Sequence, residues 1–204
     1  MLASKEPQRS GIPRKNDVSD SVLTVANQLT LLRMLLIPAF IVLIVEEERG
    51  WALAVFALAG VTDALDGLIA RWSGQKTTLG AWLDPMADKL MLVSAFVVLT
   101  LPNLGLANKL PLWLTALVIS RDVCIVITVA IVNLAVGRRT FRPSIFGKIA
   151  TGIYIVTISL AMLYNYLGYH AFIVDVAIYT SLGITLLSGF HYIWHASRLL
   201  SEPA

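Results

Sequence analysis

The stretch DALDGLIARWSGQKTTLGAWLDPMAD, residues 63–88, decides how the chain is interpreted, because it places four aspartates in an otherwise apolar sequence. Asp63 and Asp66 lie three residues apart, and Asp84 and Asp88 lie four residues apart. On a helix these spacings put both members of a pair on one face. The sequence therefore predicts two helices, each with a pair of carboxylates along one side.

The four carboxylates need compensating positive charge. A charged side chain at the centre of a bilayer costs about 2.5–3.5 kcal/mol even on insertion scales, and few basic residues lie nearby. Carboxylates without Cys or His favour hard divalent cations such as Mg²⁺, Mn²⁺ or Ca²⁺. We therefore expect the four aspartates to bind one or two divalent ions, Mg²⁺ or Mn²⁺ above all. The structural alternative is a set of buried salt bridges with Lys89 and Arg121.

Small residues and an arginine share the aspartate faces. Gly67 and Ala70 continue the first face, Arg71 follows Ala70, and Gly80 begins the second face. A glycine inside a helix costs about 1 kcal/mol relative to alanine, which indicates that something bulky approaches the backbone there. A guanidinium suits phosphate. Together these residues predict a site for a diphosphate that carries a flat base.

The chain as a whole is apolar. Of its 204 residues, 57% are hydrophobic and 14% are charged, and the mean hydropathy is +0.75. These values are too apolar for a soluble domain of this size, so they favour an all-α, polytopic membrane protein.

Residues 1–20 are expected to form a mobile cytoplasmic tail and residues 21–204 a single six-helix domain, with a short interfacial helix at residues 19–27. Pro85 is expected near the start of its helix, with regular hydrogen bonding from about Ala81. Six apolar segments are each near the roughly 20 residues that span a bilayer. They are Leu29–Val45, Trp51–Arg71, Gly80–Leu101, Leu112–Val136, Ile145–Leu167 and Ala171–Ser197.

Basic residues are distributed unevenly between the loops. The N-terminal tail carries several, and Arg138, Arg139 and Arg142 lie between the fourth and fifth segments. Because Lys and Arg favour the cytoplasmic side of a membrane, both termini and the aspartate site are expected to be cytoplasmic, most simply in a bacterial inner membrane.

The aspartates, glycines and arginine follow one fixed pattern: Asp-x-x-Asp-Gly-x-x-Ala-Arg, eight residues, then Gly-x-x-x-Asp-x-x-x-Asp. This pattern matches in full the signature of the CDP-alcohol phosphatidyltransferases, and the chain from about Asn27 onward resembles that family. The resemblance implies a CDP-diacylglycerol donor, release of CMP, a pair of divalent ions and a homodimer. It implies no nucleic-acid partner.

The resemblance also assigns roles to the signature residues. Asp63, Asp66 and Asp84 would be the principal metal ligands, and Asp63 would also contact CDP. Asp88 would share a metal and act as general base on the acceptor hydroxyl. The other implied CDP-binding residues are Gly67, Ala70 and Gly80 around the cytidine, Arg71 at the diphosphate, and Asn27 and Thr30, which either touch the cytidine or cap the first helix.

Acceptor-binding residues are expected on the remaining segments. Arg121 and Asp122 lie in the middle of an apolar segment, where charged side chains must face the interior. They either belong to the acceptor site or form an internal ion pair that packs helices together. The full set expected at the acceptor is Arg33, Arg121, Asp122, Arg142 and Lys148.

The identity of the acceptor rests on finer resemblances. The stretches 56–63 and 119–122 are similar to cardiolipin synthases, which use phosphatidylglycerol. Ala150 stands where phosphatidylglycerophosphate synthases commonly have a second lysine. Phosphatidylglycerol is therefore favoured, and glycerol 3-phosphate is the alternative. A cation transporter that uses the four aspartates is an alternative of another class, although an ion path needs no nucleotide pocket.

Overall fold

The computed structural model of the chain describes residues 25–73, 78–136 and 145–201, with side chains described for 28–65, 83, 85–128 and 145–192. Within these ranges there are six α-helices and one short 3-10 helix, and no strand, so the expected all-α fold is confirmed there. In chain order the helices are α1 (Val25–Val45), α2 (Arg49–Ser73), α3 (Thr78–Thr100), η1 (Pro102–Leu104), α4 (Leu112–Val136), α5 (Ile145–Leu167) and α6 (Phe172–Ser201).

The helix boundaries agree closely with the apolar segments, and α4 and α5 begin and end at the expected residues. α3 differs, because it begins at Thr78 and contains Pro85 as its eighth residue. Because the first four amides of a helix have no acceptor within it, regular hydrogen bonding in α3 begins close to Ala81, as expected. Proline removes only its own hydrogen bond to the carbonyl four residues earlier, so the turn before it remains helical.

α1 also begins earlier than expected. Its first residue is Val25, so Asn27 lies inside its first turn and Thr30 lies further along the helix, where it is fully buried. A capping residue precedes the first helical residue, so the capping alternative for Asn27 and Thr30 was wrong. The predicted tail and most of the predicted interfacial helix lie outside the described residues.

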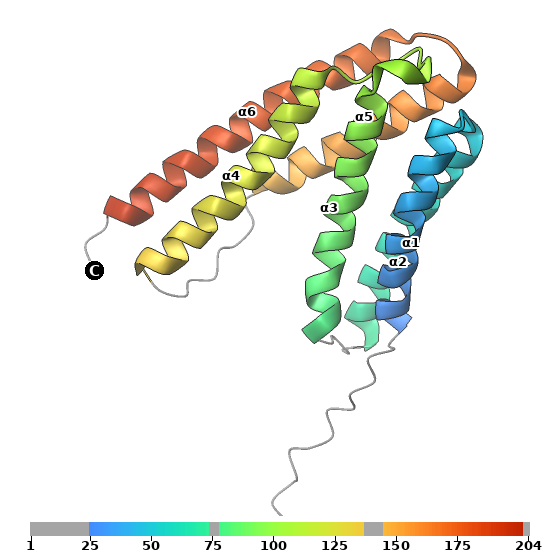
Figure 1. Cartoon of the computed structure of the whole chain (residues 1–204). Helices are drawn as coiled ribbons and strands as arrows, with labels where there is room; N and C mark the ends of the chain where they lie inside the picture. Colours follow the sequence, from blue (N-terminus) through green and yellow to red (C-terminus); the bar gives the residue numbers. More distant parts are fainter. Residues whose placement is uncertain (1–24, 74–77, 137–144, 202–204) are drawn as a thin grey trace, which may run out of the picture.

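The helices form two groups (Figure 1). α1 packs against both α2 and α3, and α4 packs against α6. α5 joins the groups, because it contacts α6 on one side and α2 and α3 on the other. In Figure 1, α4 and α6 run side by side and lean away from the three-helix group α1–α3. The start of α1, the end of α2 and the start of α3 lie together at the lower end of that group.

Buried asparagines join the turns at the opposite end of the molecule. The backbone amide of Asn108 donates to Asn165 Oδ1 at 2.7 Å, and Asn165 Nδ2 donates to the Asn108 carbonyl at 3.0 Å. Asn108 Oδ1 accepts from the amide of Ala171 at 3.0 Å. Gly168 ends α5 with φ of 80°, the left-handed geometry common after a helix C-terminus. This Asn108–Asn165 cluster ties the α3–α4 connection to the α5–α6 turn.

Three helices in the described ranges are long and apolar enough to cross a membrane: Gln28–Val45, Ile145–Leu167 and Phe172–Tyr192. In α2, α3 and α4 the described side chains cover only 49–65, 85–100 and 112–128, which is less than a typical span of about 20 residues. Large apolar side chains such as Leu35, Phe172 and Phe190 are 70–78% exposed. An outer surface of this kind suits contact with lipid.

Candidate functional site

Arg33 connects the two carboxylate helices. Its guanidinium Nη1 lies 3.2 Å from Asp63 Oδ1 on α2 and also forms an ion pair with Asp88 on α3. The Arg33 side chain is only 2% exposed, whereas Asp63 and Asp88 are 49% and 39% exposed. A buried guanidinium therefore holds two carboxylates together, and much of each carboxylate remains accessible.

An open pocket of about 120 Å³ lies beside this ion-pair cluster. Arg33, Asp63 and Asp88 form its polar part, and Thr151 reaches it from α5. Gly60, one turn before Asp63 on α2, also borders the pocket, and a Cβ added there would meet nothing within 4 Å. The remaining walls are apolar: Phe56, Ala59, Met91, Leu92 and Ile155. The pocket therefore joins a charged end to an apolar end.

The helical spacing explains this arrangement. Asp63 on α2 and Asp88 on α3 lie on consecutive helices that both pack against α1, and each carboxylate contacts the same arginine. The backbone of Asp66, Gly67, Ala70 and Arg71 continues α2. Gly80 and Asp84 belong to α3. The side chains of these residues, and that of Asn27, lie outside the described set, as does all of Arg142.

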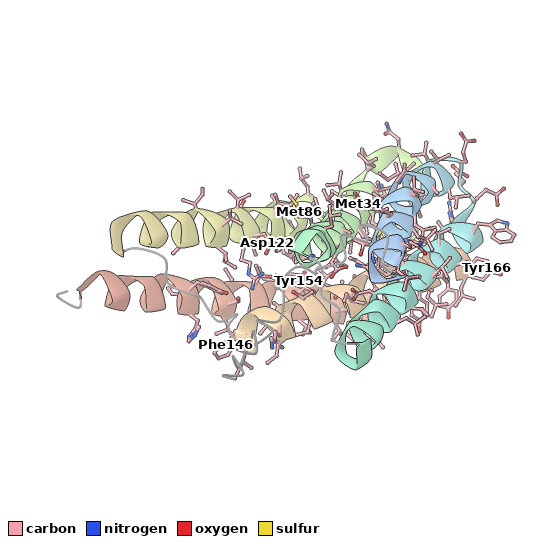
Figure 2. The ribbon with its side chains drawn as sticks, turned by 90° about the horizontal axis from the view of Figure 1, so that it is seen from below. Met34, Met86, Asp122, Phe146, Tyr154 and Tyr166 are labelled. Carbon is pink, nitrogen blue, oxygen red and sulfur yellow. The ribbon has the colours of Figure 1, made fainter. Side chains whose placement is uncertain are left out.

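A second charged cluster connects α3, α4 and α6. Lys89 Nζ on α3 lies 2.5 Å from Asp122 Oδ2, and Arg121 Nη1 donates to Asp122 Oδ1 at 2.7 Å. Arg121 Nη2 donates to Ser188 Oγ on α6 at 2.6 Å. The Arg121 side chain is 8% exposed. Figure 2 shows Asp122 and Tyr154 close to where the two helix groups meet.

Some of the predicted site residues have contacts that differ from the expected ones. Arg33 was expected at the acceptor, yet it contacts two of the aspartates. Arg121 and Asp122 form the internal ion pair that was one of their two alternatives. The ion pair is compatible with an acceptor-binding role for Arg121, because Arg121 also borders a separate groove. Lys148 is exposed near the start of α5.

Sequence reasoning missed the parts played by Gly60, Lys89 and Ser188. Gly60 could have been found, since it lies three residues before Asp63 and therefore on the same helix face. Lys89 was considered only as a counter-charge for the aspartates, but its partner is Asp122 on another helix. Nothing in the sequence around Ser188 indicates that it would accept a hydrogen bond from Arg121, because the two residues are 67 positions apart.

The chemistry of the donor set fits a hard divalent cation. Asp63 and Asp88 come from different helices, converge on one positive group and offer only oxygen ligands. Among residues with described side chains there is no group of three or more His, Cys, Asp or Glu that could hold a metal ion. Two of the four signature aspartates, Asp66 and Asp84, fall outside that set.

The chain is similar in sequence to several named lipid synthases. A human protein named "Cardiolipin synthase (CMP-forming)" is 35% identical over 162 residues, which are 70% of this chain and 52% of that protein. A Mycobacterium tuberculosis protein named "Probable phosphatidylglycerophosphate synthase" is 34% identical over 184 residues, 87% of this chain and 83% of that protein. A Streptomyces coelicolor protein named "Cardiolipin synthase (CMP-forming)" is 39% identical over 142 residues, 65% of this chain and 62% of that protein.

The chain spans about half the length of the human and rat proteins that it matches. The family model described as CDP-alcohol phosphatidyltransferase matches residues 23–187. This range contains the whole signature from Asp63 to Asp88, the Arg33 ion pairs and the Arg121–Asp122 pair. The chain therefore belongs to the CDP-alcohol phosphatidyltransferase family.

Proposed function

We propose that the protein transfers a phosphatidyl group from CDP-diacylglycerol to the free hydroxyl of phosphatidylglycerol and releases CMP. The observation that carries this proposal is the convergence of Asp63 and Asp88 on Arg33, at the mouth of a pocket with apolar walls. A lipid diphosphate has a charged end that needs cations and an apolar end that needs such walls. The family match and the names of the relatives support the same donor.

The carboxylates have different roles in this reaction. Asp63, Asp66 and Asp84 would hold a pair of divalent ions, Mg²⁺ or Mn²⁺, which would supply charge neutralisation for the diphosphate and the departing CMP. Gly67, Ala70 and Gly80 leave room for the cytidine, and Arg71 contacts the diphosphate. Arg33 contacts both Asp63 and Asp88, which favours a role for Arg33 in keeping these two carboxylates oriented toward the pocket.

Asp88 is the general base in the proposed reaction. The acceptor oxygen forms a new bond to the lipid-side phosphorus, and the bond from that phosphorus to the CMP oxygen breaks. The hydroxyl proton passes to the Asp88 carboxylate. Such transfer depends mainly on alignment and electrostatic stabilisation. The 39% exposure of the Asp88 side chain is consistent with access from the pocket.

The acceptor site is proposed on the α4–α6 side, with Arg121, Asp122, Arg142 and Lys148. Arg121 and Lys89 share one carboxylate, so the described cluster keeps a formal positive charge that suits an anionic acceptor. Phosphatidylglycerol is favoured over glycerol 3-phosphate because Ala150, which is fully buried, occupies the position of the expected second lysine. The names of the human and Streptomyces coelicolor relatives support the same choice.

The protein is proposed to cross the membrane six times as part of a homodimer. The six α-helices are 21 to 30 residues long, enough for the roughly 20 residues of a span. Basic residues in the N-terminal tail and between α4 and α5 favour cytoplasmic termini and a cytoplasmic active site. The proposed location is a bacterial inner membrane.

The test is CMP release by the purified full-length protein, supplied with CDP-diacylglycerol, Mn²⁺ and each acceptor in turn. Lipid products are identified by mass spectrometry. The proposal predicts CMP release with cardiolipin as the dominant product when both acceptors compete. Phosphatidylglycerophosphate as the dominant product would overturn the acceptor. Cation uptake into protein-containing vesicles without CMP release would favour the transporter alternative.

A further inference from the structure

Tyr154 on α5 contacts both helix groups. Its ring packs edge-to-face against Phe96 of α3, with 5.6 Å between the ring centroids and 89° between the ring planes. Its hydroxyl oxygen lies 2.5 Å from Thr185 Oγ1 of α6. α3 belongs to the three-helix group and α6 to the other group, and Figure 2 shows Tyr154 close to where the groups meet. One buried side chain therefore connects both groups to α5.

The Tyr154 hydroxyl is the donor in its bond to Thr185. Thr185 Oγ1 donates its hydrogen to the carbonyl of Ser181, one turn earlier on α6, at 2.5 Å. A threonine hydroxyl has one hydrogen, so Thr185 Oγ1 accepts from Tyr154. Both side chains are buried, at 3% and 2% exposed. No water replaces a lost partner at such a site, so the bond resists displacement of α5 against α6.

The same turn of α5 forms a wall of the pocket beside Asp63 and Asp88. Thr151 and Ile155 border that pocket, and a spacing of four residues puts them on one face of α5. Tyr154 lies between them in the sequence but is not among the residues that border the pocket. Its side chain contacts α3 and α6 instead. The contacts of Tyr154 therefore fix where this wall lies, although Tyr154 does not line the pocket.

We propose that Tyr154 is a positioning residue for phosphatidyl transfer, because its bond to Thr185 fixes the α5 wall of the pocket relative to α6. The inference rests on the proposed function and adds a residue that lies outside the aspartate signature and both charged clusters. Transfer needs the acceptor hydroxyl in line with the phosphorus, and a misplacement of about 1 Å can cost about 10²-fold in rate. Both substrates still bind when this alignment is lost, so the effect belongs to kcat and not to KM.

Tyr154→Phe tests the hydroxyl alone, because phenylalanine keeps the ring that packs against Phe96. The kcat for CMP release should fall about tenfold, whereas the KM values for CDP-diacylglycerol and for the acceptor should each change less than about twofold. Calorimetric titration with CDP-diacylglycerol and Mn²⁺ counts the binding-competent sites, and kcat is expressed per such site. A purely structural role would lower the number of competent sites and leave kcat per site unchanged.

Thr157→Val is the matched control. Thr157 lies one turn further along α5, is fully buried, and its Oγ1 lies 2.8 Å from Ser181 Oγ of α6. It does not border the pocket. The substitution removes a hydroxyl bond between the same two helices, so the melting temperature should fall as it does in Tyr154→Phe. The kcat per site should stay within about twofold of the wild type.

Thr185→Val removes the Tyr154 bond from its other end. It should lower kcat per site about as much as Tyr154→Phe does. The double variant should be no slower than either single variant, because the two substitutions remove one shared interaction. Losses that add in the double variant would show that the Tyr154–Thr185 bond is not the cause, and would overturn the inference.

The remaining outcomes separate this inference from the proposed function. CMP release by the wild type, with an unchanged kcat per site in Tyr154→Phe, would overturn the positioning role and leave the proposed function standing. An equal fall in Thr157→Val would assign the effect to general packing of α5 on α6 and would also overturn the positioning role. If the wild type released no CMP with either acceptor, the proposed function and the positioning role would both be overturned.

Discussion

The two charged clusters use arginine in opposite ways. On the α1–α3 side, Asp63 and Asp88 share Arg33, so among the described side chains two carboxylates face one guanidinium, with a formal charge of −1. On the α4–α6 side, Lys89 and Arg121 share Asp122, and the formal charge is +1. The negative cluster suits cations and the positive cluster suits an anion. The proposed reaction, which joins two lipids through a phosphate, needs both kinds of environment.

The exposure of the side chains also differs between the two charged clusters. In the first cluster the arginine is buried and the carboxylates are accessible, so their oxygens are open to a cation. In the second cluster the buried group is again the arginine, but the accessible partner is Lys89, whose side chain is 56% exposed. The predictions below test whether the two clusters serve different substrates.

The largest effect is expected from Asp63→Asn. Loss of this carboxylate should weaken metal binding and remove several kcal/mol of transition-state stabilisation, which corresponds to a loss of CMP release of about 10³-fold or more. Calorimetric titration with Mn²⁺ would be measured beside turnover. Asp175→Asn is the control, because Asp175 pairs with His170 away from both clusters. Unchanged Mn²⁺ affinity in Asp63→Asn would contradict its role as a ligand.

Asp88→Asn, which alters the same negative cluster, should reduce CMP release less than Asp63→Asn does. A general base typically contributes about 10²–10⁴-fold in rate, so turnover should fall within that range while CDP-diacylglycerol and at least one metal ion still bind. The acidic limb of the pH–rate profile should also disappear, because the group that must be deprotonated is gone. Calorimetry and turnover across pH check both points. If all metal binding were lost, Asp88 would be chiefly a ligand.

Arg121→Gln tests the positive cluster. Hydrogen bonds that involve a charged group contribute about 1.5–3 kcal/mol, so the KM for the lipid acceptor should rise roughly 10- to 100-fold. The KM for CDP-diacylglycerol should change less than about twofold, since Asp122 keeps its contact with Lys89. Steady-state kinetics with each substrate varied separately gives both constants. Equal increases in the two KM values would show that the clusters do not serve different substrates.

The smallest effect on catalysis is expected from Asn165→Ala, which alters the far end of the molecule. The substitution removes the three hydrogen bonds between the Asn165 side chain and Asn108 and leaves buried groups unsatisfied, at a cost of about 1–3 kcal/mol each. The melting temperature should fall, while both KM values stay unchanged below it. Asn103→Ala, at an exposed position in η1, is the control. A selective change in the acceptor KM would mean that this end also positions α4 and α6.

The sequence alone predicted most of the fold. Apolar segments of about 20 residues identified all six helices, and two of them had the observed boundaries. This works because a membrane-facing helix must satisfy its own backbone hydrogen bonds and be apolar over a known length. Pro85 also placed the start of regular hydrogen bonding in α3 close to Ala81, which agrees with a helix that begins at Thr78.

For the site, helical spacing puts Asp63 and Asp66, and Asp84 and Asp88, on single faces, and their role in the chemistry stays a prediction. Spacing within one helix cannot say which residue on another helix lies opposite. Only the tertiary structure paired Arg33 with Asp63 and Asp88, 30 and 55 positions away in the sequence. The tertiary structure likewise brought Arg121 within hydrogen-bond distance of Ser188 and formed the groove that Arg121 borders. Periodicity determines the face that a helix presents, whereas packing between helices determines what that face meets.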